Sequence, residues 1–374
     1  MSPPDLPPGR RVIVSELAED PLSAIDAHMA LVDMPAPDPA SLSAHDVIVA
    51  VRSAQVGWVD LLMTSGQYQH MPELPYCPGL EYAGLVAWKG PEVGDRLSIG
   101  DRVLVDGFLA GPRSLGAYQA YGGFASYAVA PAPAVLPIPG DLSFDQACNL
   151  LGNYETAYHC LVARGRLQPG ETVLVHGASG STGLAAVHLA KLLGARVIAT
   201  GRSDAKLAVV KEQGADHVIN CKNPGGEPGV RAFRSEVKEL TSGLGASVVY
   251  DGVGGDISLE SLRSVRFGAR YLVVGWAATP NVSQGKGRRG APNANMLPTN
   301  LIMMKGLDVL GCPTVISTVN DPSIRAPRLS QILRWAESGQ IKPHVSCTYP
   351  LEDFKKAMRD KWSGQVIGGS ALHP

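Results

Sequence analysis

The chain has 374 residues, of which 45% are hydrophobic and 18% are charged, and its formal net charge is -1. This length exceeds what one hydrophobic core usually serves, so we expect two domains in a globular protein of ordinary composition. The charge close to zero gives no overall electrostatic case for binding nucleic acid or an anionic membrane.

The sequence indicates neither targeting nor disulfide bonding. The N-terminal segment lacks an apolar core behind a basic start, and no apolar run approaches the roughly 20 residues that span a bilayer, so we expect a cytoplasmic protein. Six cysteines are scattered without close pairs. This spacing favours reduced, buried thiols over a disulfide framework or a thiolate zinc site.

Residues 1–150 read as short strands and turns. The run "HDVIVAVRSAQVG" alternates, "GDRVLVDGF" is short and apolar, and "GGFASYAVAPAPAVLPIP" is broken by prolines. Frequent glycine and proline between such runs predict an antiparallel, barrel-like β domain.

The pattern changes at about residue 170. Apolar strands such as "TVLVHG", "RVIATG" and "SVVYDG" now alternate with helical runs at 183–194, 204–213, 230–243 and 255–265. This alternation predicts a doubly wound parallel sheet, and therefore a Rossmann-type α/β domain, over residues 151–315.

A loop of small residues joins the first of these strands to the first helix. Its A-x-G-x-x-G spacing is a version of the dinucleotide fingerprint, placed between a strand and a helix as the fingerprint requires. A side chain at Gly180 would hold a pyrophosphate away from the free N–H groups at the helix start, whereas Gly183 lets the helix pack closely on the strand. The residues predicted to contact the pyrophosphate are Ser179, Gly180, Ser181, Thr182 and Gly183. The alternative is a glycine turn that binds no ligand.

The tip of the second strand indicates which dinucleotide is bound. Chains that bind NAD usually carry Asp or Glu there, but this strand ends in Gly201, Arg202 and Ser203, with Lys206 following. Guanidinium and ammonium groups pair with phosphate oxygens, so we predict that these residues hold the ribose phosphate of NADPH. The alternative is that Arg202 and Lys206 simply face solvent.

Residues 279–300 form a stretch rich in Gly, Pro and Asn that carries Lys286, Arg288 and Arg289. A solvated surface loop is the plainer interpretation, and a mobile lid or an anion-contacting loop at a cleft is the alternative.

Several longer motifs together resemble a known family. They include "VDLLMTSGQYQHMPELPYCPGLEYAGLV" (59–86), "GGFASYAV" (122–129), "ETAYHCLVARGRLQPGETVLVHGASGSTG" (155–183) and "HVSCTYPLEDFKKAM" (344–358). The chain is similar to zinc-free members of the medium-chain dehydrogenase/reductase superfamily, in the branch of NADPH quinone oxidoreductases and acryloyl-CoA-type enoyl reductases. The resemblance implies a GroES-like β-rich catalytic domain, formed by residues 1–150 and completed by 316–374, beside the Rossmann domain.

The resemblance also implies the remaining cofactor contacts. Thr156 and Tyr158 would face the nicotinamide end, and Asn220 would lie near the adenosine half. Gln365 would stand near the cofactor where relatives commonly carry a basic residue. The nicotinamide pocket would be lined by Val253, Val274, Gly275, Trp276, Gly311 and Cys312.

The zinc ligands of other relatives are missing from this chain. The histidine of their G-H-E motif is replaced by Leu80, and the position of their thiolate falls near Gly57. Because a catalytic zinc needs about three protein ligands, we expect no metal site.

Three residues are candidates for catalysis. Zinc-free relatives often have Asn three residues before Asp60, where its amide can polarise a carbonyl, but Gly57 occupies that position here. Asp60 itself suits a helix cap better than catalysis. Tyr68 and Tyr154 could donate a proton to a developing enolate, and the alternative for each is a packed ring.

The leading interpretation is hydride transfer from NADPH to an activated C=C bond or a quinone, without zinc. One alternative is an enoyl-thioester reductase of a biosynthetic pathway, with the basic residues of 279–300 on CoA or carrier phosphates. Another is an NADPH-binding scaffold without turnover. The apolar strand at 307–312 would be an edge strand, which the resemblance pairs across a two-fold axis in a homodimer.

Overall fold

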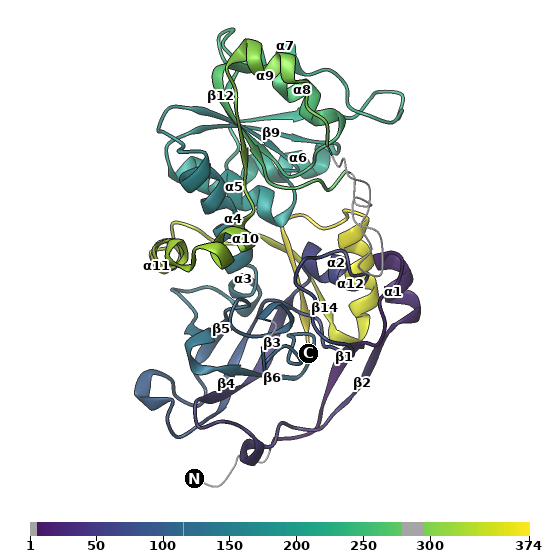
Figure 1. Ribbon diagram of the computed structural model, residues 1–374, viewed down its shortest axis with the longest axis vertical. Helices are drawn as coiled ribbons and strands as arrows, with labels where there is room; N and C mark the ends of the chain where they lie inside the picture. The colour runs from purple at the N-terminus through teal and green to yellow at the C-terminus, as the bar shows by residue number, and fades with distance from the viewer. Residues whose placement is uncertain (1–5, 115, 279–294) are drawn as a thin grey trace. The chain divides into compact units, whose positions relative to one another are not determined.

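The computed structural model describes residues 6–114, 116–278 and 295–374. The chain divides into two compact units, and among the described residues the first comprises 6–151 with 342–374, and the second 152–278 with 295–341. Figure 1 colours the chain by residue number, so that the segments of each unit can be followed along the sequence.

The first unit is built on a seven-stranded sheet. Its strand order is β14-β15-β3-β4-β5-β7, and β6 pairs with β3. All pairings are antiparallel except that of β14 with β15. The strands are β3 (Asp46–Gln55), β4 (Tyr82–Lys89), β5 (Arg102–Val105), β6 (Tyr127–Pro131), β7 (Val135–Pro137), β14 (Val345–Pro350) and β15 (Gly369–His373).

A separate antiparallel pair and four α-helices complete the described part of this unit. The pair is β1 (Gly9–Val14) with β2 (Met29–Met34). The helices are α1 (Pro21–Ala27), α2 (Trp58–Met63), α3 (Phe144–Ala147) and α12 (Phe354–Trp362). Val47, Ile48 and Val49 in the first half of β3 are completely buried, and Ala54 near its end is as well, so this long strand lies in the core.

The second unit is a parallel six-stranded sheet in the order β10-β9-β8-β11-β12-β13. Numbered within the unit, this is the 3-2-1-4-5-6 order of the dinucleotide-binding doubly wound fold. The strands are β8 (Thr172–His176), β9 (Arg196–Gly201), β10 (His217–Asn220), β11 (Ala246–Asp251), β12 (Val265–Val273) and β13 (Asp308–Gly311). The predicted fold class, a β-rich GroES-like domain with a Rossmann domain, is confirmed.

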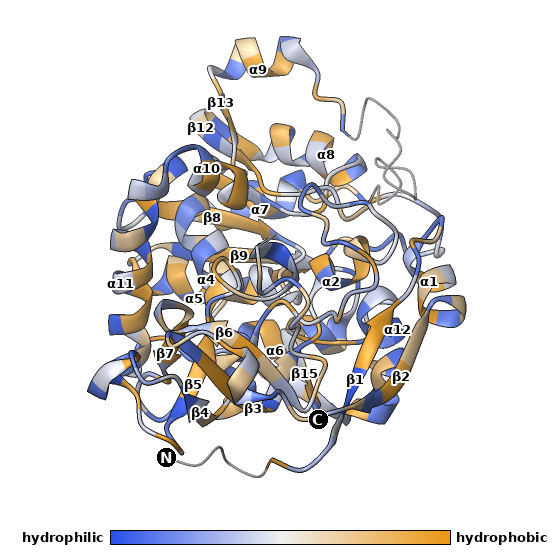
Figure 2. Cartoon of the chain, turned by 60° about the horizontal axis from the view of Figure 1, so that its bottom comes forward, coloured by the Kyte–Doolittle hydropathy of each residue, from blue (hydrophilic) through white to orange (hydrophobic). Residues whose placement is uncertain are grey.

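The four helical runs predicted at 183–194, 204–213, 230–243 and 255–265 correspond to α5, α6, α7 and α8 to within four residues at either end. Buried strands appear as near-continuous hydrophobic runs, as β8 does in orange in Figure 2. The helices are α4 (Leu151–Tyr158), α5 (Ser181–Leu192), α6 (Asp204–Glu212), α7 (Arg234–Leu240), α8 (Asp256–Ser264), α9 (Thr299–Lys305), α10 (Thr314–Asn320) and α11 (Arg325–Glu337), with a π-helical segment, His159–Arg164, directly after α4.

The expected return of the chain to the first domain at residue 316 is wrong. Both α10 and α11 belong to the second unit, and the chain returns at 342. The physical reason is a buried ion pair, in which Arg325 and Arg328 of α11 bind the carboxylate of Glu155 on α4 with N–O distances of 2.8–3.1 Å.

Candidate functional site

The glycine-rich loop lies where β8 ends and α5 begins. Gly177 adopts a left-handed conformation with φ of 63°, and Gly180 is the residue preceding the first turn of α5. A Cβ atom at Gly183 would lie 2.3 Å from the Gly177 oxygen, so close packing of the helix on the strand requires glycine there. A Cβ at Gly180 would meet the same oxygen at 3.3 Å, a contact that a small shift could relieve. The fold therefore explains Gly183 fully and Gly180 only weakly.

The start of α5 is suited to an anion. The first N–H groups of a helix have no partner within it, and the helix dipole places partial positive charge there. No side chain caps this end of α5. The start of α5 is thus of the kind that binds a pyrophosphate in dinucleotide-binding proteins.

The residues after β9 form a second place suited to phosphate. Ser203 precedes α6, but its side chain makes no capping hydrogen bond to the helix. Arg202 is exposed and makes no hydrogen bond or ion pair within the described ranges. Lys206 lies in the first turn of α6, where partial burial lowers its pKa. The structure thus brings together the start of a helix, a guanidinium, an ammonium and a hydroxyl.

The nearby carboxylate and amide are already engaged with each other. Asn220 donates from its side-chain nitrogen to Asp204 Oδ1 at 2.7 Å. Sequence reasoning missed Arg231, which donates to the Asn220 carbonyl at 2.5 Å and pairs with Glu236. Burial raises the pKa of the Cys221 thiol, and the positive charge of Arg231 opposes this effect. No local motif signals Arg231, because the chain reaches it through a turn-rich segment.

The two segments expected beside the nicotinamide are joined by backbone hydrogen bonds. The amides of Val274 and Gly275 donate to the Asp251 carbonyl at 2.9 and 3.2 Å. The amide of Ala278 donates to the Val253 carbonyl at 2.8 Å. Trp276, the next residue after Gly275, is 48% exposed. The structure therefore groups the predicted residues at 253 and 274–276 in one place.

Gly311 and Cys312 follow at the end of β13. The Cys312 amide donates to the Val273 carbonyl at 3.0 Å, which places this turn next to the end of β12. The Gly311 carbonyl accepts from Arg164 of the π-helical segment at 3.0 Å.

A buried polar layer lies at the carboxyl ends of the central strands. His176 at the end of β8 bonds Thr200 of β9 through Nδ1 at 2.8 Å and Ser261 of α8 through Nε2 at 2.5 Å. Since Ser261 donates its own proton to the Ile257 carbonyl, the proton of the His176 ring resides on Nε2. Burial lowers the pKa of His176 to about 4, so the ring is neutral near pH 7. This layer was missed because its members come from separate elements.

The Tyr154 hydroxyl is buried and hydrogen-bonded. The ring is 2% exposed, and the hydroxyl lies 2.7 Å from His188 Nδ1. His188 in turn lies 3.1 Å from the Gln213 oxygen through Nε2, so Nδ1 is the acceptor and Tyr154 the donor. These contacts agree with the packed-ring alternative, and a catalytic role of Tyr154 stays a prediction.

Thr156 and Tyr158 lie on the same helix, α4. The Thr156 hydroxyl donates to the Gly152 carbonyl at 2.7 Å, which leaves its lone pairs as acceptors. The Tyr158 ring contacts Trp335 of α11 at 5.9 Å between centroids.

Asp60, in the first unit, holds backbone rather than substrate. Its Oδ2 accepts from the Gly57 amide at 3.0 Å, and its Oδ1 accepts from Gly79 and Leu80 at 3.0 and 3.1 Å. Burial raises its pKa to about 6, against the opposing effect of these three donors. A Cβ at Gly57 would lie 2.8 Å from Oδ2, so the Asp60 carboxylate fills the space of a side chain at 57. The observed contacts are those of a cap that ties α2 to the 79–80 turn.

Trp58, Tyr68 and Gln365 also belong to the first unit. Trp58 stacks on Trp362 of α12 with centroids 5.0 Å apart and planes 7° apart. Tyr68 is half-buried near Arg113, and burial raises its pKa. Gln365 is exposed, and its amide donates to the Asp360 carbonyl at 2.8 Å.

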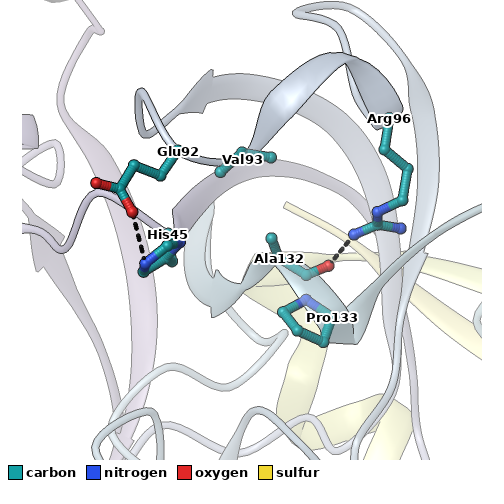
Figure 3. A pocket seen from close by; sticks show the side chains of 6 residues that line it. All are labelled: His45, Glu92, Val93, Arg96, Ala132 and Pro133. Atoms are coloured by element: carbon teal, nitrogen blue, oxygen red, sulfur yellow. Dashed lines mark hydrogen bonds and ion pairs between the residues drawn. The ribbon is translucent and has the colours of Figure 1, made fainter.

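A shallow hollow on the first unit carries none of the predicted site residues. It has a volume of about 430 Å³ and its charged side chains are engaged, His45 with Glu92 at 2.9 Å and Arg96 with the Val135 and Ala132 carbonyls (Figure 3). Within the described ranges, no group of three or more His, Cys, Asp or Glu side chains is placed to hold a metal ion.

The same part of the chain contains no helix long and apolar enough to cross a bilayer. The predicted cations Lys286, Arg288 and Arg289 lie outside the described residues.

Comparison with known proteins agrees with this fold. The alcohol dehydrogenase GroES-like domain matches residues 43–140, and the zinc-binding dehydrogenase domain matches 181–322. The quinone oxidoreductase-like protein 2 homolog of Nematostella vectensis is 33% identical over 333 residues, which cover 87% of this chain and 82% of that protein.

Solved structures match over nearly the whole length. Escherichia coli quinone oxidoreductase, complexed with NADPH, has a TM-score of 0.74 and 25% identity, with 98% of this chain and 100% of that chain covered. An NAD-dependent alcohol dehydrogenase has a TM-score of 0.76 and 26% identity, with 98% and 99% covered. The chain belongs to the quinone oxidoreductase-like proteins of the medium-chain dehydrogenase/reductase superfamily.

Proposed function

We propose that this chain is an NADPH-dependent reductase that transfers hydride to a quinone or an activated C=C bond without zinc. The observation that carries the proposal is the start of α5 at Gly180, which no side chain caps, together with Arg202, Ser203 and Lys206 after β9. Together these sites match the pyrophosphate and the extra ribose phosphate of NADPH. The NADPH complex of the E. coli relative supports this cofactor.

The bound nicotinamide would supply the hydride, and the chain's own residues bind and orient it. The start of α5 holds the pyrophosphate, and the segments at 253 and 274–276 flank the ring. As hydride adds to the β-carbon of an enone, negative charge develops on the carbonyl oxygen, and the α-carbon then takes a proton. Because the Tyr154 proton is committed to His188, we assign this proton to Tyr68 or to water.

Zinc independence rests on the residues at the metal positions of relatives. Leu80 has an alkyl side chain, and the Asp60 carboxylate fills the space beside Gly57. Treatment with a zinc chelator is expected to leave turnover unchanged. Activity that disappears with the chelator and returns with zinc would contradict this part of the proposal.

The direct test is NADPH oxidation by purified protein with a panel of quinones, enals, enones and enoyl-CoAs. We expect turnover with at least one member, and the Arg202→Ala variant should lose preference for NADPH over NADH. Saturable NADPH binding without turnover over the whole panel would instead indicate a scaffold. If Arg202→Ala leaves the NADPH to NADH efficiency ratio unchanged, the phosphate site is wrongly placed.

A further inference from the structure

Asp251, at the end of β11, is a buried carboxylate in the second unit with an unusual set of partners. It is 1% exposed. Its Oδ1 accepts from the amides of Val253 and Gly254, both at 2.9 Å, and its Oδ2 accepts from the hydroxyls of Ser258, at 2.7 Å, and Tyr271. All four partners are donors, which is the environment of an ionised carboxylate.

This negative charge has no cation against it. Within the described ranges Asp251 forms no ion pair, and the nearby imidazole, His176, is neutral. The Ser258 hydroxyl that donates to Asp251 is itself fixed by the Asn295 amide at 2.9 Å. Burying a charge without an opposite charge costs folding free energy, so we looked for a function of this carboxylate that offsets the cost.

The position of Asp251 indicates this function. Its side chain bonds the 253–254 turn, and its carbonyl bonds Val274 and Gly275, so one residue holds both segments assigned to the nicotinamide. The nicotinamide ring is neutral when reduced and positively charged when oxidised. A fixed negative charge behind its walls favours the oxidised form over the reduced form.

Resting on the proposed function, we propose that Asp251 is an electrostatic positioning residue whose buried charge makes the bound NADPH a stronger hydride donor. Asp251 acts through its field and through the two segments it holds, and it does not touch the substrate. The expected signature is a change in the ratio of the affinities for NADP⁺ and NADPH. If Asp251 had a purely structural role, both affinities would change by the same factor and the ratio would stay constant.

The test is calorimetric titration of each variant with NADP⁺ and with NADPH separately. In Asp251→Asn we expect the ratio of Kd for NADP⁺ to Kd for NADPH to rise about tenfold, in line with removal of one unit charge from a partly desolvated site. Tyr271→Phe removes a hydrogen bond but keeps the charge, and is the matched control that should leave the ratio unchanged.

A second variant covers the case in which Asp251→Asn does not fold. Asn295 is half-buried and accepts from the Gly255 amide at 3.2 Å, so Asn295→Asp adds charge to the same network. This change should lower the ratio severalfold, and the uncharged Asn295→Ala should not. If the wild type binds both forms and neither charge change moves the ratio, the inference about Asp251 is overturned alone. If the wild type binds neither form, the proposed function falls with it.

Discussion

Gly180 and Gly183 lie in the same loop, but the structure requires them for different reasons. The close approach of α5 to β8 leaves no room for a side chain at 183, whereas the 180 position meets one oxygen at a distance that can relax. Packing thus explains Gly183, and we propose that a ligand explains Gly180. Substitutions at the two positions should therefore separate binding from stability.

We expect Gly183→Ala to lower the free energy of unfolding by about 1–3 kcal/mol, the usual cost of forcing a carbon atom into a packed site. Gly180→Ala should change it by less than about 0.5 kcal/mol, as at a permissive position. Chemical denaturation of both variants gives the comparison. Equal destabilisation would show that the two glycines share one structural role.

Tyr154→Phe should retain turnover, because the wild-type hydroxyl is already bound to His188. Tyr68→Phe should lower kcat by about 100-fold if the phenol donates the proton, which is the usual scale for a general acid. Steady-state kinetics with one enone decides between them. A loss of that size in Tyr154→Phe, with an intact circular dichroism spectrum, would return Tyr154 to the mechanism.

Asp60 should make stability depend on pH in an identifiable window. Burial raises its pKa from 3.8 to about 6, so the folded protein binds this proton more tightly than the unfolded chain. Its stabilising contribution is present below about pH 4 and is lost as the pH rises through 6, by about 3 kcal/mol at most. The test is to measure the free energy of unfolding of the wild type and of Asp60→Asn at several pH values between 4 and 7. A difference between them that does not change with pH would mean that the Asp60 pKa is not raised.

At the scale of elements, α11 is attached to α4 by a charged cluster inside the second unit. Glu155 and Arg328 are each 2% exposed, and Arg328 also donates to Thr318 at 2.8 Å. The cluster joins residues more than 160 positions apart in sequence. It explains why α10 and α11 belong to this unit.

Removing the carboxylate should therefore be costly. In Glu155→Gln two guanidinium groups lose their charge partner in a buried place, and we expect a loss of about 3 kcal/mol in the free energy of unfolding. The control is Lys356→Ala, whose exposed ion pair with Asp360 should contribute little to the free energy of unfolding. Similar small effects of both variants in urea denaturation would contradict the role given to Glu155.

At the scale of the whole molecule, the edge of the second sheet is the place where a second copy is expected. Along the described chain β13 pairs only with β12, and apolar side chains near it are exposed, with Val309 at 38% and Met303 at 73%. Such an edge is usually covered, and pairing two edges about a two-fold axis would form a continuous sheet.

We expect the protein to be a dimer in solution and Val309→Asp to shift it toward the monomer. Leu244→Asp is the control, since Leu244 is also apolar and exposed, at 66%, but lies in the turn before β11. Sedimentation at several concentrations measures both. A wild type that stays monomeric, or a dimer indifferent to Val309→Asp, would exclude this interface.

The sequence predicted the features of this molecule that are formed by residues close together in the chain. The glycine loop, the basic tip of β9 and the alternation of strands and helices are local patterns, and the fold class and the family they predicted are confirmed. The Asp251 and His176 networks could not be predicted, because their members are separated by up to 85 residues and meet only when the sheet forms. The same reason explains the wrong boundary at 316, since Arg325 finds Glu155 only in three dimensions.

The most direct test of the central claim is calorimetric titration of the purified protein with NADPH. The claim is that a phosphorylated dinucleotide lies on bare main chain at the start of α5. It predicts saturable binding at one site per chain in the wild type, and at least about tenfold weaker binding in Gly180→Val with unchanged folding. No heat of binding in the wild type, or equal affinity in Gly180→Val, would contradict it.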